Sequence, residues 1–338
     1  MDGLAKAIAR LKDIAEKTGF STNTVSLALR ESPRIPEETR SVIRSVAIEL
    51  NYLPNHIAKS LVSRETRTIG LVLTDIMNPT LTQTAQAVEI ALAERGYGTL
   101  FATSNNTLSE EIKVVEMFRS RQVDGLLIYP SRHQDFEYLR PLRRANFPIV
   151  LLIADPNAGI DGVSVNDRSG GLKATRHLIG LGHRGIGFLD ASHPNGNDEK
   201  LEGYQQALSQ AGIPPVPALV VPTNGHYATH GYFAMDNLMS LPNRPTAVFS
   251  DNDSIALGAL RWCHKHGVRV PADLAIMGYD NIEFTEFAEP PLSTVNYDVD
   301  TVSRMAVDRV LRLIGAGDQL PEPRVTLIDP ELVIREST

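Results

Sequence analysis

Cysteine is almost absent from this chain of 338 residues, which contains only Cys263, so an intrachain disulfide is excluded. No apolar stretch is long enough to span a bilayer, and the first residues lack the apolar core of a secretory signal. These absences favour a protein of the cytoplasm, and we expect it there.

Motifs that carry catalysis or hold cofactors are also missing. No phosphate-binding GxxxxGK[ST] loop occurs, and Gly185 and Gly187 begin a strand, so they do not form the strand-turn-helix motif of dinucleotide sites. His264 and His266 have no cysteine or acidic companion at metal-ligand spacing, and no nucleophile elbow is found. We therefore expect no enzymatic activity, no cofactor and no metal.

Residues 11–30, LKDIAEKTGFSTNTVSLALR, predict two short helices joined by a tight turn. Gly19 supplies the turn, and Ser21 is a good N-cap for the second helix. The apolar side chains at helical spacing are Leu11, Ile14, Ala15, Val25, Ala28 and Leu29. The side chains left on the outer face of the second helix are Thr22, Asn23, Ser26, Leu27 and Arg30. Such a helix can read base edges in the major groove of DNA; the alternative is an ordinary amphipathic helical hairpin.

A third helix should close this small core. Residues 36–38 are typical of a helix start, and apolar residues follow at helical spacing from Ile43 to Leu50. The next segment, 51–61, has Pro54 before a helical stretch that is too short to be stable alone, because isolated helices of fewer than about 12 residues are marginal in water. We expect this stretch to become ordered only when something holds it.

The charge is divided unevenly along the chain. Residues 1–68 contain eleven Lys and Arg against eight Asp and Glu, a net charge of +3, whereas the whole chain carries −7, so the remainder carries −10. Binding to DNA phosphates should therefore be confined to the first segment and should weaken with salt. The basic residues expected at phosphates are Arg30, Arg34, Lys59 and Arg64.

From Thr68 onward, short β-rich runs alternate with helical segments, the pattern of doubly wound parallel sheets. Strands are predicted at 69–74, 99–103, 125–129 and 149–153, with helices near 82–95, 109–121 and 134–145. The rhythm then restarts, with strands at 163–165, 186–189, 219–221, 247–250 and 275–277, helices near 169–181, 199–211, 229–240 and 253–267, and a last strand near 325–334. Two such units imply two lobes. Ligands of such sheets lie beyond the carboxyl ends of the strands, so we expect the ligand site between the lobes.

Polar residues follow several of the predicted strands. They are Asn78 and Thr80, Asn166 and Asp167, Asn252 and Asp253, and Asp280. Carboxylates and amides can bind paired hydroxyl groups or ring nitrogens, and an aromatic face can cover the apolar side of a sugar or a base. Each of these residues could instead be a helix cap or a turn residue, and Asp253 fits that alternative best.

Ten motifs along the chain occur in the order in which one protein family has them. They are KDIAEKTGFSTNTVS, EETR, LNYLPN, IAKSL, RTIGLVLTDIMNP, RQVDGLLI, HLIGLGHRGIGFL, DNDSIALGAL, IMGYDN and PPLSTV. With these motifs the chain resembles the lactose-repressor (LacI/GalR) family of bacterial transcriptional regulators. The resemblance implies a small all-α helix-turn-helix head joined to an α/β core like that of periplasmic binding proteins, with two doubly wound parallel sheets.

The resemblance also implies how the chain would bind DNA. A homodimer would place each head in a major groove at half of a pseudo-palindromic operator in double-stranded DNA, with Leu61 of the hinge wedged between base pairs in the minor groove. Position by position, the DNA-contacting residues would be Ser21, Thr22, Asn23, Ser26, Leu27, Arg30, Arg34, Tyr52, Asn55, Ala58, Lys59 and Leu61. Most members have arginine where this chain has Leu27. We expect Leu27 to contact a thymine methyl group or sugar edges, or else to pack on the head, and Asn23 to read adenine.

A small-molecule effector is implied in the cleft between the lobes. The residues expected to hold it are Asn78, Thr80, Lys200, Tyr227, Asn252 and Asp280, with Tyr227 as the aromatic wall. Lys200 replaces the family's usual arginine and offers a point charge where that residue offers a planar fork. Ile153 stands where many sugar-responsive members have an acid, and Asp155 is close by. We expect a sugar or sugar derivative that acts as an inducer; the alternative is a nucleobase or nucleoside corepressor.

The expected domains are a head at 1–54, a hinge helix and linker at 55–67, an N-terminal lobe at 68–165 with about 297–325, and a C-terminal lobe at 166–296 with about 326–338. No terminal leucine heptad follows the last strand, so a dimer is favoured over a tetramer. The alternative from a different class is a sugar-binding receptor without DNA function, which would lack the head and the hinge.

Overall fold

The computed structural model describes residues 9–52, 65–153, 155–191, 198–317 and 319–338. The chain separates into two compact units, residues 1–66 and 67–338. Most of the hinge predicted at 55–67 lies outside the described residues, so its helix stays a prediction.

The first unit contains a helical head made of α1 (Leu11–Thr18), α2 (Thr22–Leu29) and α3 (Glu37–Glu49), as predicted. Its core is formed by Ile14, Val25, Ala28 and Ile43, which are fully buried, so each helix contributes to one apolar centre. The turn between α1 and α2 uses Gly19 at a φ of +74°, a conformation that glycine adopts without steric strain. The head thus has the helix-turn-helix geometry that the apolar spacing predicted.

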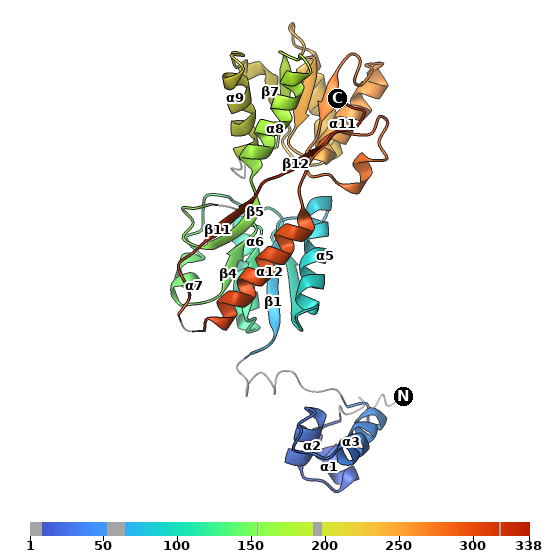
Figure 1. The fold of residues 1–338 in the computed structure, drawn as a ribbon, viewed down its shortest axis with the longest axis vertical. Coiled ribbons are helices and arrows are strands. Elements are labelled where there is room, and N and C mark those ends of the chain that lie inside the picture. The colour runs from blue at the N-terminus through green and yellow to red at the C-terminus, as the bar shows by residue number, and fades with distance from the viewer. Residues whose placement is uncertain (1–8, 53–64, 154, 192–197, 318) are drawn as a thin grey trace, which may run out of the picture. The chain divides into compact units, whose positions relative to one another are not determined.

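The first lobe of the second unit is a parallel sheet covered by helices on both faces (Figure 1). Its strands are β1 (Thr68–Leu73), β2 (Gly98–Thr103), β3 (Gly125–Ile128), β4 (Ile149–Leu151), β5 (Asp161–Val165) and β11 (Val325–Ile328), in the order β11-β5-β4-β3-β1-β2. Helices α5 (Pro79–Ala93) and α12 (Val299–Gly315) pack on one face, and α6 (Leu108–Ser120) and α7 (Arg140–Arg144) on the other. Strands β3 and β4 are buried throughout, which explains their continuous apolar runs.

The second lobe repeats this plan with a parallel sheet in the order β7-β6-β8-β9. The strands are β6 (Ile186–Asp190), β7 (Val220–Pro222), β8 (Ala247–Ser250) and β9 (Ala275–Met277), with short 3₁₀ turns η1 (Pro217–Leu219) and η2 (Glu283–Thr285). Helices α8 (Asp167–Gly180) and α9 (Glu199–Gln210) pack on one face, and α10 (Ala228–Met239) and α11 (Asp253–His266) on the other. At Gly203 a Cβ atom would come within 2.2 Å of the Arg168 carbonyl oxygen, so only glycine allows α8 and α9 to approach this closely. Two doubly wound sheets are therefore confirmed.

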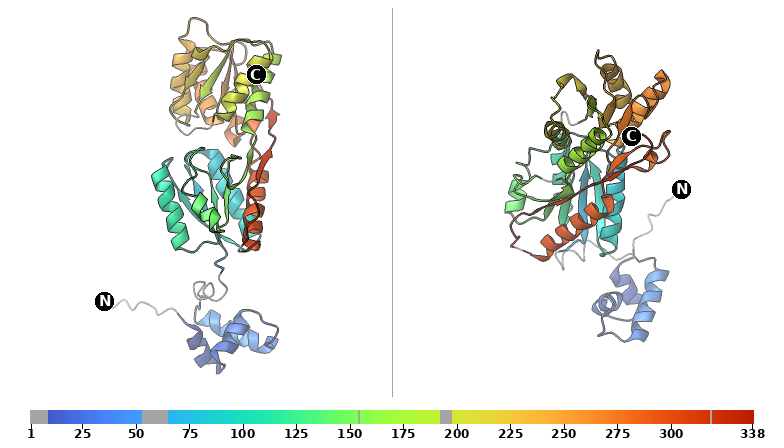
Figure 2. Two further views of the ribbon diagram at one scale, coloured as in Figure 1. Left: turned by 90° about the vertical axis from the view of Figure 1, so that its left-hand side faces the viewer. Right: turned by 45° about the horizontal axis from the view of Figure 1, so that its top comes forward.

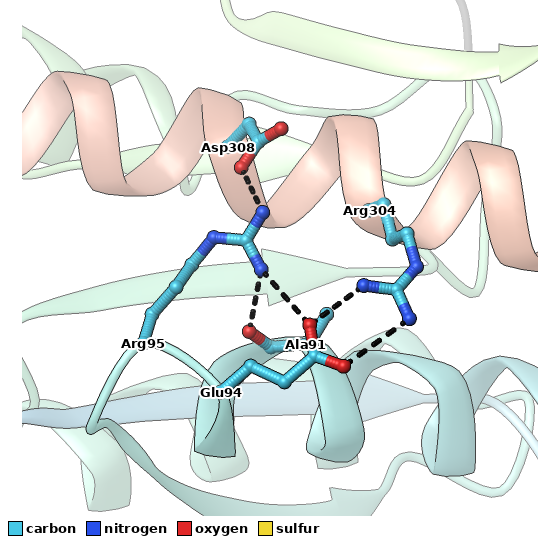
Figure 3. A network of polar contacts seen from close by, with 5 residues as sticks. All are labelled: Ala91, Glu94, Arg95, Arg304 and Asp308. Atoms are coloured by element: carbon cyan, nitrogen blue, oxygen red, sulfur yellow. Dashed lines mark hydrogen bonds and ion pairs between the residues drawn. The ribbon is translucent and has the colours of Figure 1, made fainter.

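The chain passes between the lobes after β5, after β10 (Thr294–Asn296) and after β11, and these connections lie together at one side of the core (Figure 2). Strand β10 pairs with β12 (Glu331–Val333) in a small antiparallel sheet beside the second lobe. Helix α12 follows β10 and packs on α5 of the first lobe. At that contact Arg95 donates to Asp308 at 2.6 Å and Arg304 donates to Glu94 at 2.7 Å (Figure 3). Such exposed ion pairs add little stability, so the apolar contacts below them hold α12.

The strand at 163–165, which was counted with the second series of strands, is β5 and completes the first sheet by pairing with β4 and β11, in agreement with the lobe boundary expected at 165. Two other predictions of local structure were wrong. The helix expected near 134–145 is confined to α7, since Pro141 lies in its first turn and cannot sit in a helix interior. The last strand divides at Pro330 into β11 in the first lobe and β12 beside the second, so the final crossing lies after Ile328 and not at about 325.

Candidate functional site

On the head, the first turn of α2 is left free of the core. Ser21 caps the helix by accepting a hydrogen bond from the Thr24 amide nitrogen at 3.1 Å, and Thr22 and Asn23 are exposed. Ser26 and Leu27 are half-buried, and Leu27 is not among the apolar side chains that pack on the described core of the head. The side chains predicted to read DNA therefore share one accessible helix face.

Two of the predicted phosphate contacts, Arg30 and Arg34, are exposed at the end of α2 and in the following turn. Arg44 of α3 forms ion pairs with Glu31 and Glu37, so its charge is engaged within the head. The Tyr52 ring packs on the head's core, and burial raises the pKa of its hydroxyl, so Tyr52 has a structural role that its predicted DNA contact did not anticipate. The predicted contacts Asn55, Ala58, Lys59, Leu61 and Arg64 lie outside the described residues.

In the second unit, a cavity of about 440 Å³ and a smaller compartment of about 100 Å³ lie where the carboxyl ends of the strands of both lobes meet. The two compartments share Tyr129, His133, Asp167 and Tyr297, so they are adjacent parts of one site. The walls come from both lobes, because residues that follow β1 and β3 face residues of α8, α9 and the start of α11. This is the position at which doubly wound sheets bind ligands.

Most of the residues predicted to hold an effector line the smaller compartment, namely Asn78, Thr80, Lys200, Asn252 and Asp280. Two of them are helix caps as well. The Asn78 Oδ1 accepts from the Thr80 amide nitrogen at 3.0 Å, and the Asn252 Oδ1 accepts from the Ile255 amide nitrogen at 2.8 Å. The NH₂ group of Asn252 also donates a hydrogen bond to the His226 carbonyl oxygen at 3.3 Å. The cap alternative is therefore confirmed for both asparagines, which border the compartment at the same time.

Lys200 is turned toward the protein. Its Nζ donates to the Asp251 carbonyl oxygen at 2.8 Å, lies 3.8 Å from the Asp251 carboxylate, and sits 4.1 Å from the centre of the Tyr279 ring. Burial alone would lower the pKa of Lys200, but the carboxylates of Asp251, Asp167 and Asp280 outweigh it and raise that pKa, so the lysine stays charged. Its positive charge is balanced within the second lobe, which limits what it can offer to a ligand.

Asp280 combines backbone strain with an unusual charge state. Its φ of +108° is a conformation that non-glycine residues rarely adopt, and such strain persists at ligand sites where the surroundings fix it. The fully buried Asp253 fixes it here, since its carboxylate accepts from the Ile282 amide nitrogen at 2.9 Å and from the Thr294 hydroxyl at 2.7 Å. Burial raises the pKa of Asp280 to about 7, opposed by the charge of Lys200. Asp253 is thus a structural residue, in agreement with the sequence-based interpretation.

Tyr227 does not form the aromatic wall that was predicted, because neither compartment is lined by it. It is 41% exposed and stands at the N-terminus of α10, where its ring stacks on His230. Its hydroxyl donates to the carboxylate of Asp75, which follows β1 in the first lobe. Tyr227 therefore links the two lobes beside the cavity and does not face into it.

The aromatic walls are Tyr129 and Tyr297, which the sequence-based site did not include. Each directly follows a strand, β3 or β10, so a search of strand ends that included aromatic residues would have found them. His133 and Gln134 lie on the loop after Tyr129, which is held by the buried carboxylate of Glu111. This carboxylate accepts from the Ser131 amide nitrogen at 2.5 Å, from the Ser131 hydroxyl at 2.7 Å and from the Tyr138 hydroxyl.

Two general checks concern the described residues only. No group of three or more His, Cys, Asp or Glu side chains there has the arrangement of a metal site. In the same residues, helices that combine the length and the apolarity needed to cross a membrane are not found.

Comparisons with known proteins match both units. A family model described as bacterial regulatory proteins, lacI family, matches residues 10–55, and one described as a periplasmic binding protein-like domain matches residues 175–338. The ribose operon repressor of Haemophilus influenzae is 34% identical over 337 residues, and the HTH-type transcriptional repressor PurR of Vibrio atlanticus is 32% identical over 334 residues, each covering 98% of both chains.

Solved structures give the same picture. The lac repressor dimer bound to operator and the anti-inducer ONPF is 25% identical, with a TM-score of 0.88 over 98% of this chain and 99% of that chain. A complex of the transcriptional regulator CelR with cellobiose is 29% identical, with a TM-score of 0.73 over 98% of this chain and 100% of that chain. Both the fold and the order of the two units are therefore shared with DNA-binding regulators.

Proposed function

This chain belongs to the lacI family of bacterial regulatory proteins, and from that premise we propose that it represses transcription as an operator-bound homodimer controlled by a small molecule held between its lobes. Membership of the family makes it a DNA-binding transcriptional regulator and not an enzyme. One observation carries the proposal: a single chain has both a helical head with a free α2 face and a polar cavity built from two lobes. Because operator DNA is its target, we place the protein in the bacterial cytoplasm.

In this proposal, Thr22 and Asn23 make the base contacts and Arg30 and Arg34 bind phosphates. The exposure of all four side chains supports these roles. Leu27 has no hydrogen-bonding group, so it would contact a thymine methyl group, and its position outside the packed core supports a contact with DNA. Phosphate contacts should make the affinity fall with salt, whereas the base contacts of Asn23 should set the sequence preference.

A homodimer is the proposed assembly, with the hinge residue Leu61 wedged into the operator's minor groove. The second lobe exposes three phenylalanine side chains, Phe233 on α10 at 65%, Phe284 on η2 at 60% and Phe287 just after it at 77%. Aromatic side chains are enriched at protein interfaces, so these positions are suited to contact with a second copy. Sedimentation of the full chain should give a dimer, and Phe287→Ser should shift the equilibrium toward monomer without loss of helix content.

The proposed effector is a sugar or sugar derivative that acts as an inducer. The cavity supports this because carboxylates accept hydrogen bonds from hydroxyl groups, while Tyr129 and Tyr297 can cover the apolar face of a ring. The relatives differ in this respect, since one is named a ribose operon repressor and others are PurR repressors, and a solved neighbour is a complex with cellobiose. A nucleobase or nucleoside corepressor is the second candidate, favoured by the 32% identity to the PurR repressor over nearly the whole chain.

Control would pass from the cavity to the head through the relative position of the lobes. An effector that contacts both lobes changes how they sit, and the first lobes of a dimer would then meet in a different way. A coupling free energy of about 1 to 3 kcal/mol would change operator affinity about 5- to 150-fold. The hinge predicted at 55–67 would respond, since its short helix needs support to persist.

The direct test is fluorescence anisotropy of the purified full chain with duplex DNA from upstream of its own gene, at fixed salt, with and without ribose, cellobiose, hypoxanthine or guanine. Specific binding that one compound weakens supports an inducer, and specific binding that one compound strengthens supports a corepressor. Asn23→Ala should lower operator affinity and leave the effector affinity unchanged. Binding no stronger than that to a random duplex, with every compound, would contradict the proposal.

A further inference from the structure

Carboxylates dominate the cavity. Within the described residues, the lining of the two compartments contains eight Asp or Glu side chains and only two basic ones, Arg168 and Lys200. The acids come from both lobes, for example Asp75 and Asp155 from the first lobe and Glu199 and Asp280 from the second. A ligand that enters therefore meets carboxyl groups from both lobes.

Both basic side chains already have partners. The Arg168 guanidinium donates to the Glu202 carboxylate. Lys200 is 8% exposed and donates to the Asp251 carbonyl while pairing with its carboxylate. Burial lowers the pKa of His133 to about 4, and that of His226 is also lowered by burial, so both histidines of the lining are neutral near pH 7. In the described part of the cavity, no cation is left over to balance an anionic ligand.

The carboxylates also crowd one another. Burial and the nearby charge of Asp167 raise the pKa of Glu199 to about 7, and Asp280 titrates in the same range. Each of these groups would be relieved by a positive charge or by hydroxyl donors nearby, because both stabilise the ionised form. The buried Thr80 hydroxyl lines the smaller compartment beside Asp280, where it favours the ionised carboxylate, and it makes no other hydrogen bond of normal geometry with the described residues.

From the eight acids, the two paired cations and the two-lobed cavity, we infer that the effector carries no negative charge and that an amine-bearing polyol binds more tightly than its neutral counterpart. Phosphorylated and carboxylated forms are rejected because their anionic groups would lose water and gain no cation. The hydroxyl groups of the ligand donate to carboxylates, its amine is placed among the acids near Glu199, and Tyr129 and Tyr297 cover its apolar face. This inference rests on the proposed effector role of the cavity and adds the charge of the ligand to it.

The charge of the cavity can be measured without knowing the ligand. The native Cys263 is 1% exposed and buried in the second lobe, so single cysteines can be added at accessible positions. Gln134→Cys places a thiol on an exposed residue of the cavity lining, and Ser240→Cys places one on an exposed residue at the far end of α10 as a matched control. Both are treated with methanethiosulfonates of equal size that carry an ammonium, a hydroxyl or a sulfonate group.

At low ionic strength, the ratio of the thiol modification rate with the ammonium reagent to that with the sulfonate reagent should be at least about tenfold higher at Gln134→Cys than at Ser240→Cys. In 1 M salt this difference should shrink, because the screening length falls to about 3 Å. Equal ratios at the two sites would overturn the inference. A second arm titrates matched sets, such as glucosamine, glucose and glucose 6-phosphate, or the corresponding forms of ribose. For any skeleton that binds, a phosphate form tighter than the neutral form would also overturn it. Operator binding is measured in parallel, so failure of the repressor proposal is seen separately.

Discussion

The hydrogen bond between Tyr227 and Asp75 is predicted to hold the two lobes in the arrangement seen here. It joins Tyr227, at the start of α10 in the second lobe, to Asp75, which follows β1 in the first lobe. Tyr227→Phe removes only the hydroxyl and keeps the ring that stacks on His230. The substitution therefore tests the contact between lobes without opening a hole in the packing.

The magnitude follows from the exposure of the pair. A hydrogen bond to a charged group contributes about 1.5–3 kcal/mol when it is buried, but Tyr227 is 41% exposed and water competes for both partners. We expect about 1 kcal/mol, which changes the equilibrium between lobe arrangements about fivefold. Burial and the hydrogen bond with Asp75 raise the pKa of Tyr227, with the hydrogen bond as the larger cause, so the hydroxyl remains a donor over the whole neutral range.

A double-mutant cycle measures this contribution. Tyr227→Phe, Asp75→Ala and the double variant are compared by urea unfolding of the full chain and by operator affinity. The cycle is needed because the other oxygen of Asp75 accepts from the Met77 amide nitrogen at 2.7 Å, and the cycle cancels that separate loss. A coupling free energy of about 1 kcal/mol is expected in unfolding, with a change of severalfold in operator affinity. Additive effects in both assays would refute the idea that this pair connects the lobes.

Four further outcomes are expected. Glu111→Ala should destabilise the chain by about 3 kcal/mol in urea unfolding, because it leaves the buried Ser131 donors unpaired, and Glu111→Gln should cost less since an acceptor remains; equal losses would contradict this. Asn23→Ala should weaken operator binding by about 1–3 kcal/mol and relax the preference at one base pair, as read by selection on randomised operators. In the same selection Leu27→Arg should introduce a guanine preference that the native chain lacks. Because the folded-state pKa of Asp280 is raised to about 7, its stabilising contribution is present below its unfolded pKa near 4 and is lost as the pH rises through 7. Asp280→Asn should therefore be more stable than the native chain at pH 8 by up to about 4 kcal/mol in thermal melts, and no difference should remain below pH 4.

Local patterns predicted most elements, because each apolar stripe has the period of the element that buries it. The helices of the head and the buried strands of both lobes follow directly from such spacing. Pairing partners are not encoded locally, which is why β5 was counted with the second series of strands although it pairs with β4 and β11. Pro330 divides the last strand, and a run of β-forming residues on both sides concealed the division.

For the candidate site, the sequence predicted which residues lie near the cavity but did not predict which way all of their side chains point. Strand ends located Asn78, Asn252 and Asp280 near one another, because the carboxyl ends of each parallel sheet lie along one edge and these edges of both sheets border the cavity. The direction of a side chain depends on distant partners. Asp251 turns Lys200 inward and Asp75 holds Tyr227 beside the cavity, and neither partner is near in sequence.

In the proposed function, the α2 face of the head binds a specific DNA sequence and the cavity between the lobes controls this binding. Fluorescence anisotropy at fixed salt, with the duplex upstream of the chain's own gene against a random duplex, tests it most directly. We expect an affinity at least about 10³-fold higher for the specific duplex. This difference should be lost in a Thr22→Ala, Asn23→Ala double variant that keeps its helix content, and it should be shifted by a cavity ligand in the native chain. Equal affinity for both duplexes, or full affinity in the double variant, would contradict it.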